Sequence, residues 1–442
     1  HHEVSRVAGL LEAAGADAFN VTGGWHESRA PQITGDVPTG AYAWLAEAIK
    51  SAVKVPVAAS NRINDPEVAE RILRENRADF ISMGRPLLAD PHLPRKLMDG
   101  EAVQINHCIA CNVCLDSAWA GPAQCLVNPA AGREAELPGP SSTARRVLVV
   151  GGGPAGMMAA KVAATRGHAV ALWEKEPHLG GVAAIGDVAP GKREYRWLYQ
   201  DLARQVSADD RIAVQLGKEA TLEAIREAQP EALILATGGR PVYPSLPVPR
   251  DATIAVVHAH DVLAGAIDRV GRNVVVLGGG PTACETALHI KELGSLDAET
   301  VKFLLVHRLV DVDELRTMAM HGRNSRNVTV VQRSSRFAKD LNKSVRWTLL
   351  ESMEAAGVSS LANSTIQSIE PDAVVIATAD GRSMRITCDT IVLAVGVSAE
   401  NRLYDQVRTH MSDMPVYLIG DAAAPRQATE ALLEGWRVAN SL

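Results

Sequence analysis

The first hundred residues alternate between two hydrophobic patterns. Three segments have apolar residues at helical spacing and predict amphipathic helices, and three short apolar runs between them predict strands. The predicted helices span 3–14, 41–53 and 65–76, and the predicted strands span 17–22, 55–59 and 79–83. Because parallel strands need a crossover helix, this order predicts an α/β fold with a parallel sheet or barrel. The strands are too few for a closed (β/α)8 TIM barrel, so we expect the last strands only, in a chain that starts part-way through the barrel.

A buried-type strand at 147–150 runs into a glycine-rich turn and a helix. Gly151, Gly153 and Gly156 have the G-x-G-x-x-G spacing of a dinucleotide-binding fold. The first glycine makes the tight turn, the second lets the backbone approach a pyrophosphate, and the third allows close helix packing. Glu174 ends the next predicted strand, where its carboxylate is placed to hydrogen-bond ribose hydroxyls. These residues together predict a Rossmann-like dinucleotide site.

Two later motifs indicate which dinucleotide binds. Thr237 and Gly238 lie in an Ala-Thr-Gly turn that closes an apolar strand, and Asp421 follows a glycine late in the chain. This pattern resembles the two-dinucleotide-fold flavoprotein reductases, in which such an Asp contacts the ribityl chain of the flavin. The resemblance implies an FAD site in the first fold, Gly181 included, interrupted by an inserted second fold. Without it, Asp421 would be interpreted as a cap of the following helix.

The second fold begins with a strand at 274–277. Gly278, Gly280 and Ala283 follow it with G-x-G-x-x-A spacing. In a two-fold reductase this unit is predicted to hold the nicotinamide nucleotide.

The strand that distinguishes NADH from NADPH is predicted at 328–331. It ends at Gln332 and Arg333, with Arg336 close behind, whereas an acidic residue would favour NADH. Arginine can pair bidentately with a 2′-phosphate, so the sequence predicts NADPH. The alternative is that both arginines are solvated surface charges, because the gap between the preceding helix and this strand is long. Within that gap, periodicity leaves 301–306 open between strand and helix.

Four of the six cysteines are clustered. Cys108, Cys111, Cys114 and Cys125 have the spacing C-x2-C-x2-C-x10-C, whose soft thiolates can hold an iron–sulfur cluster or zinc. Spacing alone does not separate these two, but a neighbouring flavin fold favours an electron carrier, and we predict a 4Fe-4S cubane. The two remaining cysteines are predicted to be buried small hydrophobes.

Composition narrows the class of protein. The 442 residues carry a net charge of −6 and no basic block interleaved with aromatic residues, which gives no support to a nucleic-acid partner. No apolar run reaches the roughly 18 residues of a membrane span, and no signal pattern opens the chain. We therefore expect a cytoplasmic enzyme with a small-molecule substrate and no membrane contact, and the sequence leaves a homo-oligomer open.

The order of these parts resembles the 2,4-dienoyl-CoA reductase and trimethylamine dehydrogenase family. The resemblance rests on Cys-Ile-Ala-Cys-Asn-Val-Cys-Leu-Asp, then Cys-Leu-Val-Asn-Pro, then the glycine-rich FAD unit. It implies an old-yellow-enzyme barrel fused to an iron–sulfur segment and a reductase module, with an FMN site that is incomplete in this chain. The expected domains are a barrel part at 1–105, an iron–sulfur segment and linker at 106–143, an FAD domain at 144–265 and 375–442, and an NAD(P)H domain at 266–374.

The same resemblance implies roles for residues at the ends of the barrel strands. His26, in Gly-Trp-His-Glu, is similar to the histidine with which the dienoyl-CoA reductases help protonate the substrate. Arg62 is expected near FMN, and Gly84 and Arg85 at its phosphate, because the carboxyl ends of barrel strands face the pocket. For Arg62 the alternative is an ion pair at the barrel mouth.

We expect NADPH-dependent reduction of a conjugated enoyl-CoA-type substrate through FAD, the 4Fe-4S cluster and FMN. Two alternatives stay open. The x2 spacing before the third cysteine resembles the amine dehydrogenases, although the aspartate of that branch is absent near His26. The chain could also be a truncated electron-transfer module without substrate chemistry of its own.

Overall fold

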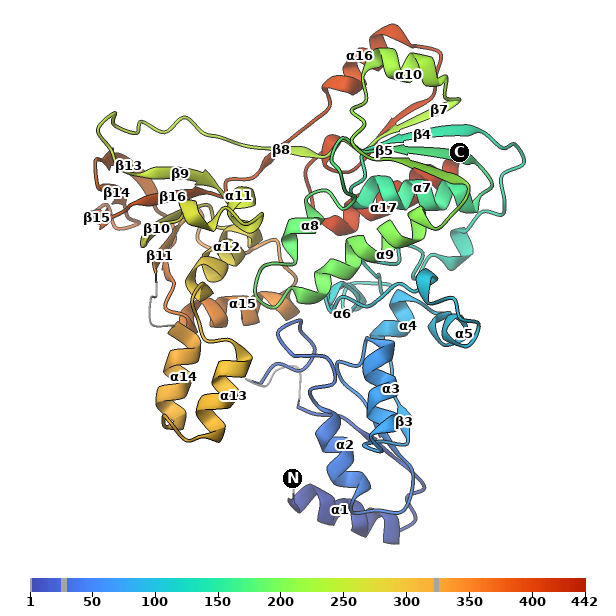
Figure 1. Cartoon of the computed structure of the whole chain (residues 1–442), viewed down its shortest axis with the longest axis vertical. Helices are drawn as coiled ribbons and strands as arrows, with labels where there is room; N and C mark the ends of the chain where they lie inside the picture. The colour runs from blue at the N-terminus through green and yellow to red at the C-terminus, as the bar shows by residue number, and fades with distance from the viewer. Residues whose placement is uncertain (1, 25–29, 322–325) are drawn as a thin grey trace. The chain divides into compact units, whose positions relative to one another are not determined.

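The computed structural model describes residues 2–24, 30–321 and 326–442 (Figure 1). The chain divides into two compact units. The first unit comprises His1–Ala184, Gly191–Gly239 and Ala399–Leu442, and the second comprises Ile185–Pro190 and Arg240–Ser398. No helix in the described part of the chain combines the length and apolar character needed to cross a membrane.

The barrel part of the first unit has the predicted alternation of helix and strand. Its elements are α1 (His2–Ala13), β1 (Phe19–Val21), α2 (Ala43–Lys50), β2 (Val57–Ala59), α3 (Pro66–Arg74) and β3 (Phe80–Ile81). The strands form a parallel sheet in the order β1-β2-β3, so their carboxyl ends lie along one edge. The Asp65 side chain caps α3 by accepting from the Glu67 N–H at 2.9 Å. Ile72 packs from α3 into the core with Val57 and Ala59.

Short helices surround the cysteine segment. They are α4 (Arg85–Ala89), α5 (Leu93–Met98), η1 (Ala102–Gln104), α6 (Val113–Ala118) and η2 (Glu134–Glu136). Cys114 lies in α6, and the other three clustered cysteines lie in loops.

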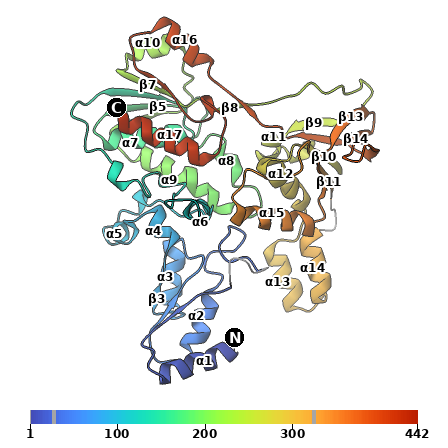
Figure 2. The ribbon, with the colours of Figure 1, turned by 180° about the vertical axis from the view of Figure 1, so that it is seen from behind.

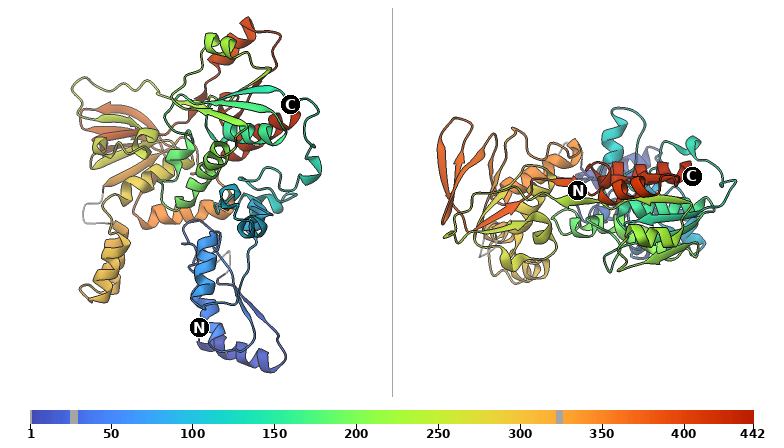
Figure 3. Two further views of the ribbon diagram at one scale, coloured as in Figure 1. Left: turned by 45° about the vertical axis from the view of Figure 1, so that its right-hand side comes forward. Right: turned by 90° about the horizontal axis from the view of Figure 1, so that it is seen from above.

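The first dinucleotide-type fold completes the first unit. Its strands are β4 (Arg146–Val150), β5 (Ala169–Trp173), β6 (Ile212–Gln215), β7 (Ala232–Leu235) and β18 (Val416–Leu418), paired in parallel in the order β18-β7-β4-β5-β6. Its helices are α7 (Pro154–Thr165), η3 (Arg193–Tyr195), α9 (Arg196–Ser207), α10 (Leu222–Ala228), α16 (Arg402–His410), η5 (Gly420–Ala422) and α17 (Ala428–Ser441). The short helix α8 (Ala183–Gly186) spans the point at which the chain passes into the second unit. The C-terminal helix α17 lies beside α7 in every ribbon view (Figures 1, 2 and 3). This close approach depends on Gly435, whose added Cβ would lie 2.3 Å from the Ala155 carbonyl oxygen.

The second unit contains the second dinucleotide-type sheet. Its parallel strands are β9 (Ala255–His258), β10 (Asn273–Leu277), β11 (Asn327–Val331), β12 (Ser359–Leu361) and β16 (Thr390–Leu393), in the order β12-β11-β10-β16-β9. An antiparallel sheet consists of β13 (Thr365–Glu370), β14 (Ala373–Ala377) and β15 (Ser383–Thr387). The helices are α11 (Ala259–Leu263), η4 (Ile267–Arg269), α12 (Pro281–Glu292), α13 (Ala298–Val306), α14 (Val312–His321) and α15 (Lys343–Ala355).

The segment that periodicity left open is helical. Residues 301–306 belong to α13, which lies against α14 as a helical hairpin (Figure 2). This hairpin accounts for the long gap between α12 and β11 in the sequence.

The second unit is wider than the expected domain at 266–374. The chain enters it after Gly239 and leaves it at Ser398. The second unit includes residues on both sides of 266–374 because β16 pairs with β10, and β9 pairs with β16, in one parallel sheet. At the two crossings, β8 (Gly239–Pro241) and β17 (Val397–Ala399) form a two-stranded sheet.

Replacing Gly435 with alanine is expected to destabilise the first unit. The new Cβ would overlap the Ala155 carbonyl and force α17 away from α7, and overpacking of this kind costs about 1–3 kcal/mol. Thermal unfolding followed by circular dichroism should show a lower midpoint than that of the unmodified chain. The matched control is Gly121→Ala, at a glycine of the first unit whose added Cβ meets no atom within 4 Å. Equal midpoints for the two variants would contradict the expected clash.

Candidate functional site

The first glycine-rich loop has the backbone geometry that its spacing predicts. Gly151 has φ +108°, and a Cβ there would lie 2.2 Å from the Ala236 carbonyl oxygen. A Cβ at Gly156 would lie 1.9 Å from the Gly151 carbonyl oxygen, so α7 can approach the loop only with glycine at this position. At Gly153 an added Cβ would meet no atom within 4 Å. The space beside Gly153 fits the approach of a phosphate group, as predicted for FAD.

Glu174 lies buried beside this loop. One carboxylate oxygen accepts from the Gly152 N–H at 2.6 Å, and the other accepts from the Glu176 N–H at 2.8 Å. Gly181, with φ +53°, lies against Gly153, because its added Cβ would be 3.1 Å from the Gly153 Cα. Glu174 and Gly181 therefore both lie at the mouth of the loop, where their role in FAD binding stays a prediction.

Two loops that follow neighbouring strands lie beside the same fold. The Thr237 hydroxyl donates to the Glu400 carbonyl at 2.5 Å, and the Gly238 carbonyl accepts from the Glu400 N–H at 3.1 Å. These hydrogen bonds connect the turn after β7 to Glu400, in the segment that leads back from the second unit into the first. Asp421 follows β18, which is the parallel neighbour of β7, and its carboxylate accepts from the Arg426 N–H at 3.1 Å.

Asp421 does not cap α17. Gln427 is the N-cap residue of that helix, so the cap interpretation is wrong. Burial raises the pKa of the Asp421 carboxyl, and the Arg426 N–H and guanidinium partly oppose this rise. Contact between Asp421 and the ribityl chain stays a prediction.

The second glycine-rich loop repeats the backbone geometry of the first. Gly278 has φ +126°, and its added Cβ would lie 2.2 Å from the Ala394 carbonyl oxygen. Gly280 again has open space beside it, and Ala283 is fully buried. The loop therefore offers the same kind of space for a pyrophosphate.

Gln332 lies against this second loop, and no role in coenzyme binding was predicted for it from the sequence. It follows β11, as Glu174 follows β5, and its Oε1 lies where a Cβ on Gly279 would be, 1.6 Å from that ideal position. The side chain is buried, its Oε1 accepts from the Ser334 hydroxyl at 3.3 Å, and its Nε2 has no partner among the described residues. Arg333 and Arg336, the predicted phosphate-binding residues, are both exposed.

Residues at the edge of the barrel part are tied to other segments. Arg62 is almost completely buried and forms an ion pair with Glu194, with 2.5 Å between Nη2 and Oε1. The alternative of an ion pair for Arg62 is thus realised, with a partner outside the barrel part. Arg85 Nη1 donates to the Ile33 carbonyl and to the Asn112 side-chain oxygen, each at 2.5 Å. Gly84 is the N-cap residue of α4 and has open space beside it, while His26 lies outside the described residues.

The four clustered cysteines lie within electrostatic range of one another. Burial raises the pKa of the Cys111, Cys114 and Cys125 thiols, to about 12 for Cys125, and the neighbouring thiols raise all three further. Ala110 and Asn112 have left-handed backbone, with φ +52° and +57°, which turns the chain sharply on either side of Cys111. Among the described residues, no group of three or more His, Cys, Asp or Glu side chains has the arrangement of a metal-ion site.

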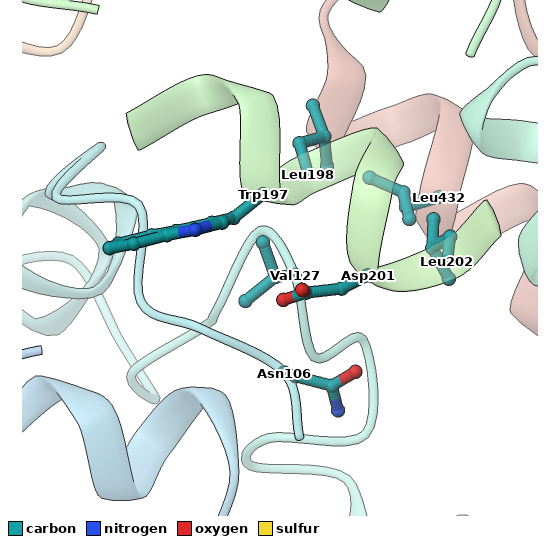
Figure 4. A pocket seen from close by; sticks show the side chains of 7 residues that line it. All are labelled: Asn106, Val127, Trp197, Leu198, Asp201, Leu202 and Leu432. Carbon is teal, nitrogen blue, oxygen red and sulfur yellow. The ribbon is translucent and has the colours of Figure 1, made fainter. Parts of the chain in front are cut away.

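The cysteine segment also contacts α9 of the first dinucleotide-type fold. The His107 N–H donates to Asp201 Oδ2 at 2.8 Å, and the His107 ring stacks on Trp197 with 4.6 Å between centroids. A cavity of about 10 Å³ lies here, lined by Asn106, Val127, Trp197, Leu198, Asp201, Leu202 and Leu432 (Figure 4). It has room for no more than a water molecule, so it is a packing defect and not a substrate pocket.

The reductase part and the barrel part of the chain each match a known protein family. Residues 145–435 match the pyridine nucleotide-disulphide oxidoreductase family, and residues 3–104 match the NADH:flavin oxidoreductase / NADH oxidase family. These families confirm flavin and NAD(P) as the cofactors of the two modules.

Relatives and solved structures have the same two modules in one chain. A metal reductase from Desulforamulus reducens is 39% identical over 435 residues, which cover 97% of this chain and 64% of that protein. An NADH oxidase from Thermoanaerobacter brockii is 33% identical over 447 residues, which cover 99% and 63%. A structure of 2-naphthoyl-CoA reductase with 2-naphthoyl-CoA superposes with a TM-score of 0.86 at 32% identity, covering 100% of this chain and 62% of that one.

The chain therefore spans less than two thirds of the length of these proteins. The first family covers more than half of the chain, and the barrel part precedes it in the order predicted from the sequence. The chain belongs to the pyridine nucleotide-disulphide oxidoreductase family, in the branch whose reductase module is fused to an old-yellow-enzyme segment of the NADH:flavin oxidoreductase / NADH oxidase type.

Proposed function

We propose that the protein is an NADPH-dependent iron–sulfur flavoprotein that reduces a C=C double bond of a conjugated acyl thioester, as a 2,4-dienoyl-CoA reductase does. One observation carries this proposal: the cysteine segment is bonded to both flavin-type modules. The Cys108 carbonyl accepts from Asn64 Nδ2 of the barrel part at 2.6 Å, and the next residue back, His107, donates to Asp201 of α9. A carrier at this position can pass electrons between the two modules.

The geometry of the glycine-rich loops and of Arg62 supports the nucleotide and flavin cofactors that this relay needs, whereas the cluster is proposed from the type and number of the clustered cysteines. Open space beside Gly153 and Gly280 admits phosphate groups at the two loops, and the helices that follow present their N-termini there. Arg62 Nη1 is buried without a partner among the described residues, which fits an acceptor group of FMN. Four thiolates are the ligand set of a 4Fe-4S cluster.

The chemistry divides between these groups and the chain. When bound, the nicotinamide supplies a hydride, the flavins convert electron pairs into single electrons, and the cluster carries those one at a time. The glycine-rich loops would bind the phosphates of the nucleotides, and the four clustered cysteines would hold the cluster. His26, which follows the first predicted barrel strand in the sequence, is proposed to hold the proton that the substrate carbon receives, as a general acid.

The substrate class rests on two further supports. The segment around His26 resembles that of the dienoyl-CoA reductases, and the 2-naphthoyl-CoA reductase is named for an aromatic acyl-CoA. The cysteine spacing keeps amine oxidation as the second candidate. The two functions differ in one assay, because an amine dehydrogenase loses its flavin absorbance with a methylated amine and ignores NADPH.

Substitution of His26 with alanine is expected to lower kcat for the enoyl thioester by about 10²–10⁴-fold, the usual contribution of a general acid. NADPH oxidation with an artificial electron acceptor should stay unchanged, because that reaction needs no proton transfer to substrate carbon. The control is His92→Ala, an exposed histidine of α5's N-cap. Unchanged enoyl reduction in the His26 variant would remove this residue from the mechanism.

Replacing Cys125 with serine is expected to abolish the cluster, because a hydroxyl is a poor ligand for iron where a thiolate is needed. Iron and acid-labile sulfide should fall from about four each per chain to near zero, while FAD content is retained. Cys284→Ser, at a buried cysteine of α12, is the control and should keep its iron. Zinc in place of iron in the unmodified protein would refute the electron-carrier assignment.

Gln332→Glu is expected to shift the coenzyme preference towards NADH. A carboxylate at the end of β11 would repel a 2′-phosphate and accept from ribose hydroxyls, so the ratio of kcat/KM for NADPH to that for NADH should fall at least about tenfold. Arg333→Ala should lower the same ratio by weakening NADPH alone. Arg272→Ala, an exposed arginine at the opposite end of the sheet, is the control. A protein that already prefers NADH would contradict the NADPH assignment.

A further inference from the structure

Arg62 is a barrel residue whose charge is balanced from outside the barrel. It follows β2 in left-handed conformation, with φ +54°, and only 1% of its side chain is exposed. Its Nε donates to the Val37 carbonyl at 2.9 Å, and its Nη2 contacts Glu194 Oε1 at 2.5 Å. Glu194 lies in η3, directly before α9, and is therefore part of the FAD-type fold.

Asn64 occupies the second oxygen of the same carboxylate. Its Nδ2 donates to Glu194 Oε2 at 3.0 Å and to the Cys108 carbonyl at 2.6 Å. Both oxygens of Glu194 are thus used by residues of the barrel part. One buried carboxylate therefore joins the FAD-type fold to the barrel edge, and Asn64 extends this network to the cysteine segment.

Two polar atoms of this network have no partner in the described part of the chain. They are Arg62 Nη1 and Asn64 Oδ1, and both are buried. An unsatisfied buried donor or acceptor is costly, and most such groups in native proteins have a partner. Because Nε and Nη2 of Arg62 are already engaged, Nη1 is the donor that is left for a bound group.

We propose that Glu194 is the positioning residue of this network: it fixes the Arg62 guanidinium at the FMN site and sets its effective charge there. This inference rests on the proposed function, in which Arg62 contacts FMN. Glu194 is the carboxylate with which Arg62 pairs among the described residues, and a buried arginine that loses such a partner becomes an uncompensated positive charge. Reduced FMN is more negative than oxidised FMN, so an uncompensated positive charge beside the flavin favours reduction. Glu194 therefore holds the FMN potential down from within the FAD-type fold.

The test uses the full-length holoenzyme and measures the FMN midpoint potential by anaerobic spectroelectrochemical titration with dithionite and reference dyes. Glu194→Gln keeps the shape of the side chain and removes its charge. It should favour reduced over oxidised FMN about tenfold, which is a rise of about 30 mV for a two-electron couple. Glu194→Asp keeps the charge and should restore most of the wild-type value. The FAD potential should not move in either variant.

Asp201→Asn is the matched control. It removes another buried carboxylate that contacts the cysteine segment but not Arg62, and it should leave the FMN potential unchanged. A merely structural role for Glu194 would lower the thermal stability and the content of FMN and FAD together, without moving the FMN potential.

The possible outcomes distinguish failure of the Glu194 inference from failure of the proposed function. Loss of FMN from the Glu194→Gln variant, with FAD retained and FMN recovered in Glu194→Asp, supports Glu194 as the positioning residue. An unchanged FMN potential in Glu194→Gln, or an equal shift in Asp201→Asn, overturns the inference and leaves the proposed function intact. Absence of FMN from the unmodified holoenzyme overturns the proposed function itself.

Discussion

The chain segment that precedes the first clustered cysteine is held by two folds at once, and the proposed relay depends on this constraint. Asn64 binds the Cys108 carbonyl from the barrel edge, and Asp201 binds the His107 N–H from α9. Glu194 joins these two sides, because its carboxylate contacts Asn64 and Arg62 while its own helix, η3, directly precedes α9. A cysteine segment anchored in this way keeps a fixed position relative to both modules, which electron transfer between them requires.

The two glycine-rich loops have the same backbone arrangement, although they are proposed to bind different coenzymes. In both loops the first glycine contacts the carbonyl of a neighbouring strand end and the second has open space beside it. They differ at the residue that follows the next strand, where the first fold has Glu174 and the second has Gln332. Glu174 accepts from the Gly152 N–H, whereas Gln332 lies over Gly279 with its amide nitrogen unpartnered in the described part of the chain. The neutral side chain leaves the second site free of a charge that would repel a phosphate.

The sequence alone predicted the helices, strands and glycine-rich loops that depend on residues close together in the chain. Hydrophobic periodicity located β4, α7 and β5, and glycine spacing located the loop between them, because each depends on neighbouring residues. The apolar run 301–306 was ambiguous for the same reason, since so short a run suits a helix or a strand. The pairing of β9 with β16, which places β9 in the second sheet although it precedes residue 266, could not be predicted from local patterns because the two strands lie more than a hundred residues apart. The partner of Arg62 could not be predicted, because Glu194 is 132 residues distant and no motif surrounds it.

The most direct test of the relay is freeze-quench EPR of the full-length protein after anaerobic mixing with NADPH alone. The relay predicts the signal of a reduced 4Fe-4S cluster in parallel with loss of the oxidised absorbance of both flavins. It also predicts that an enoyl thioester added next returns cluster and flavins to the oxidised state. Loss of the FAD absorbance alone, with the cluster and FMN still oxidised, would contradict an electron path through the cysteine segment.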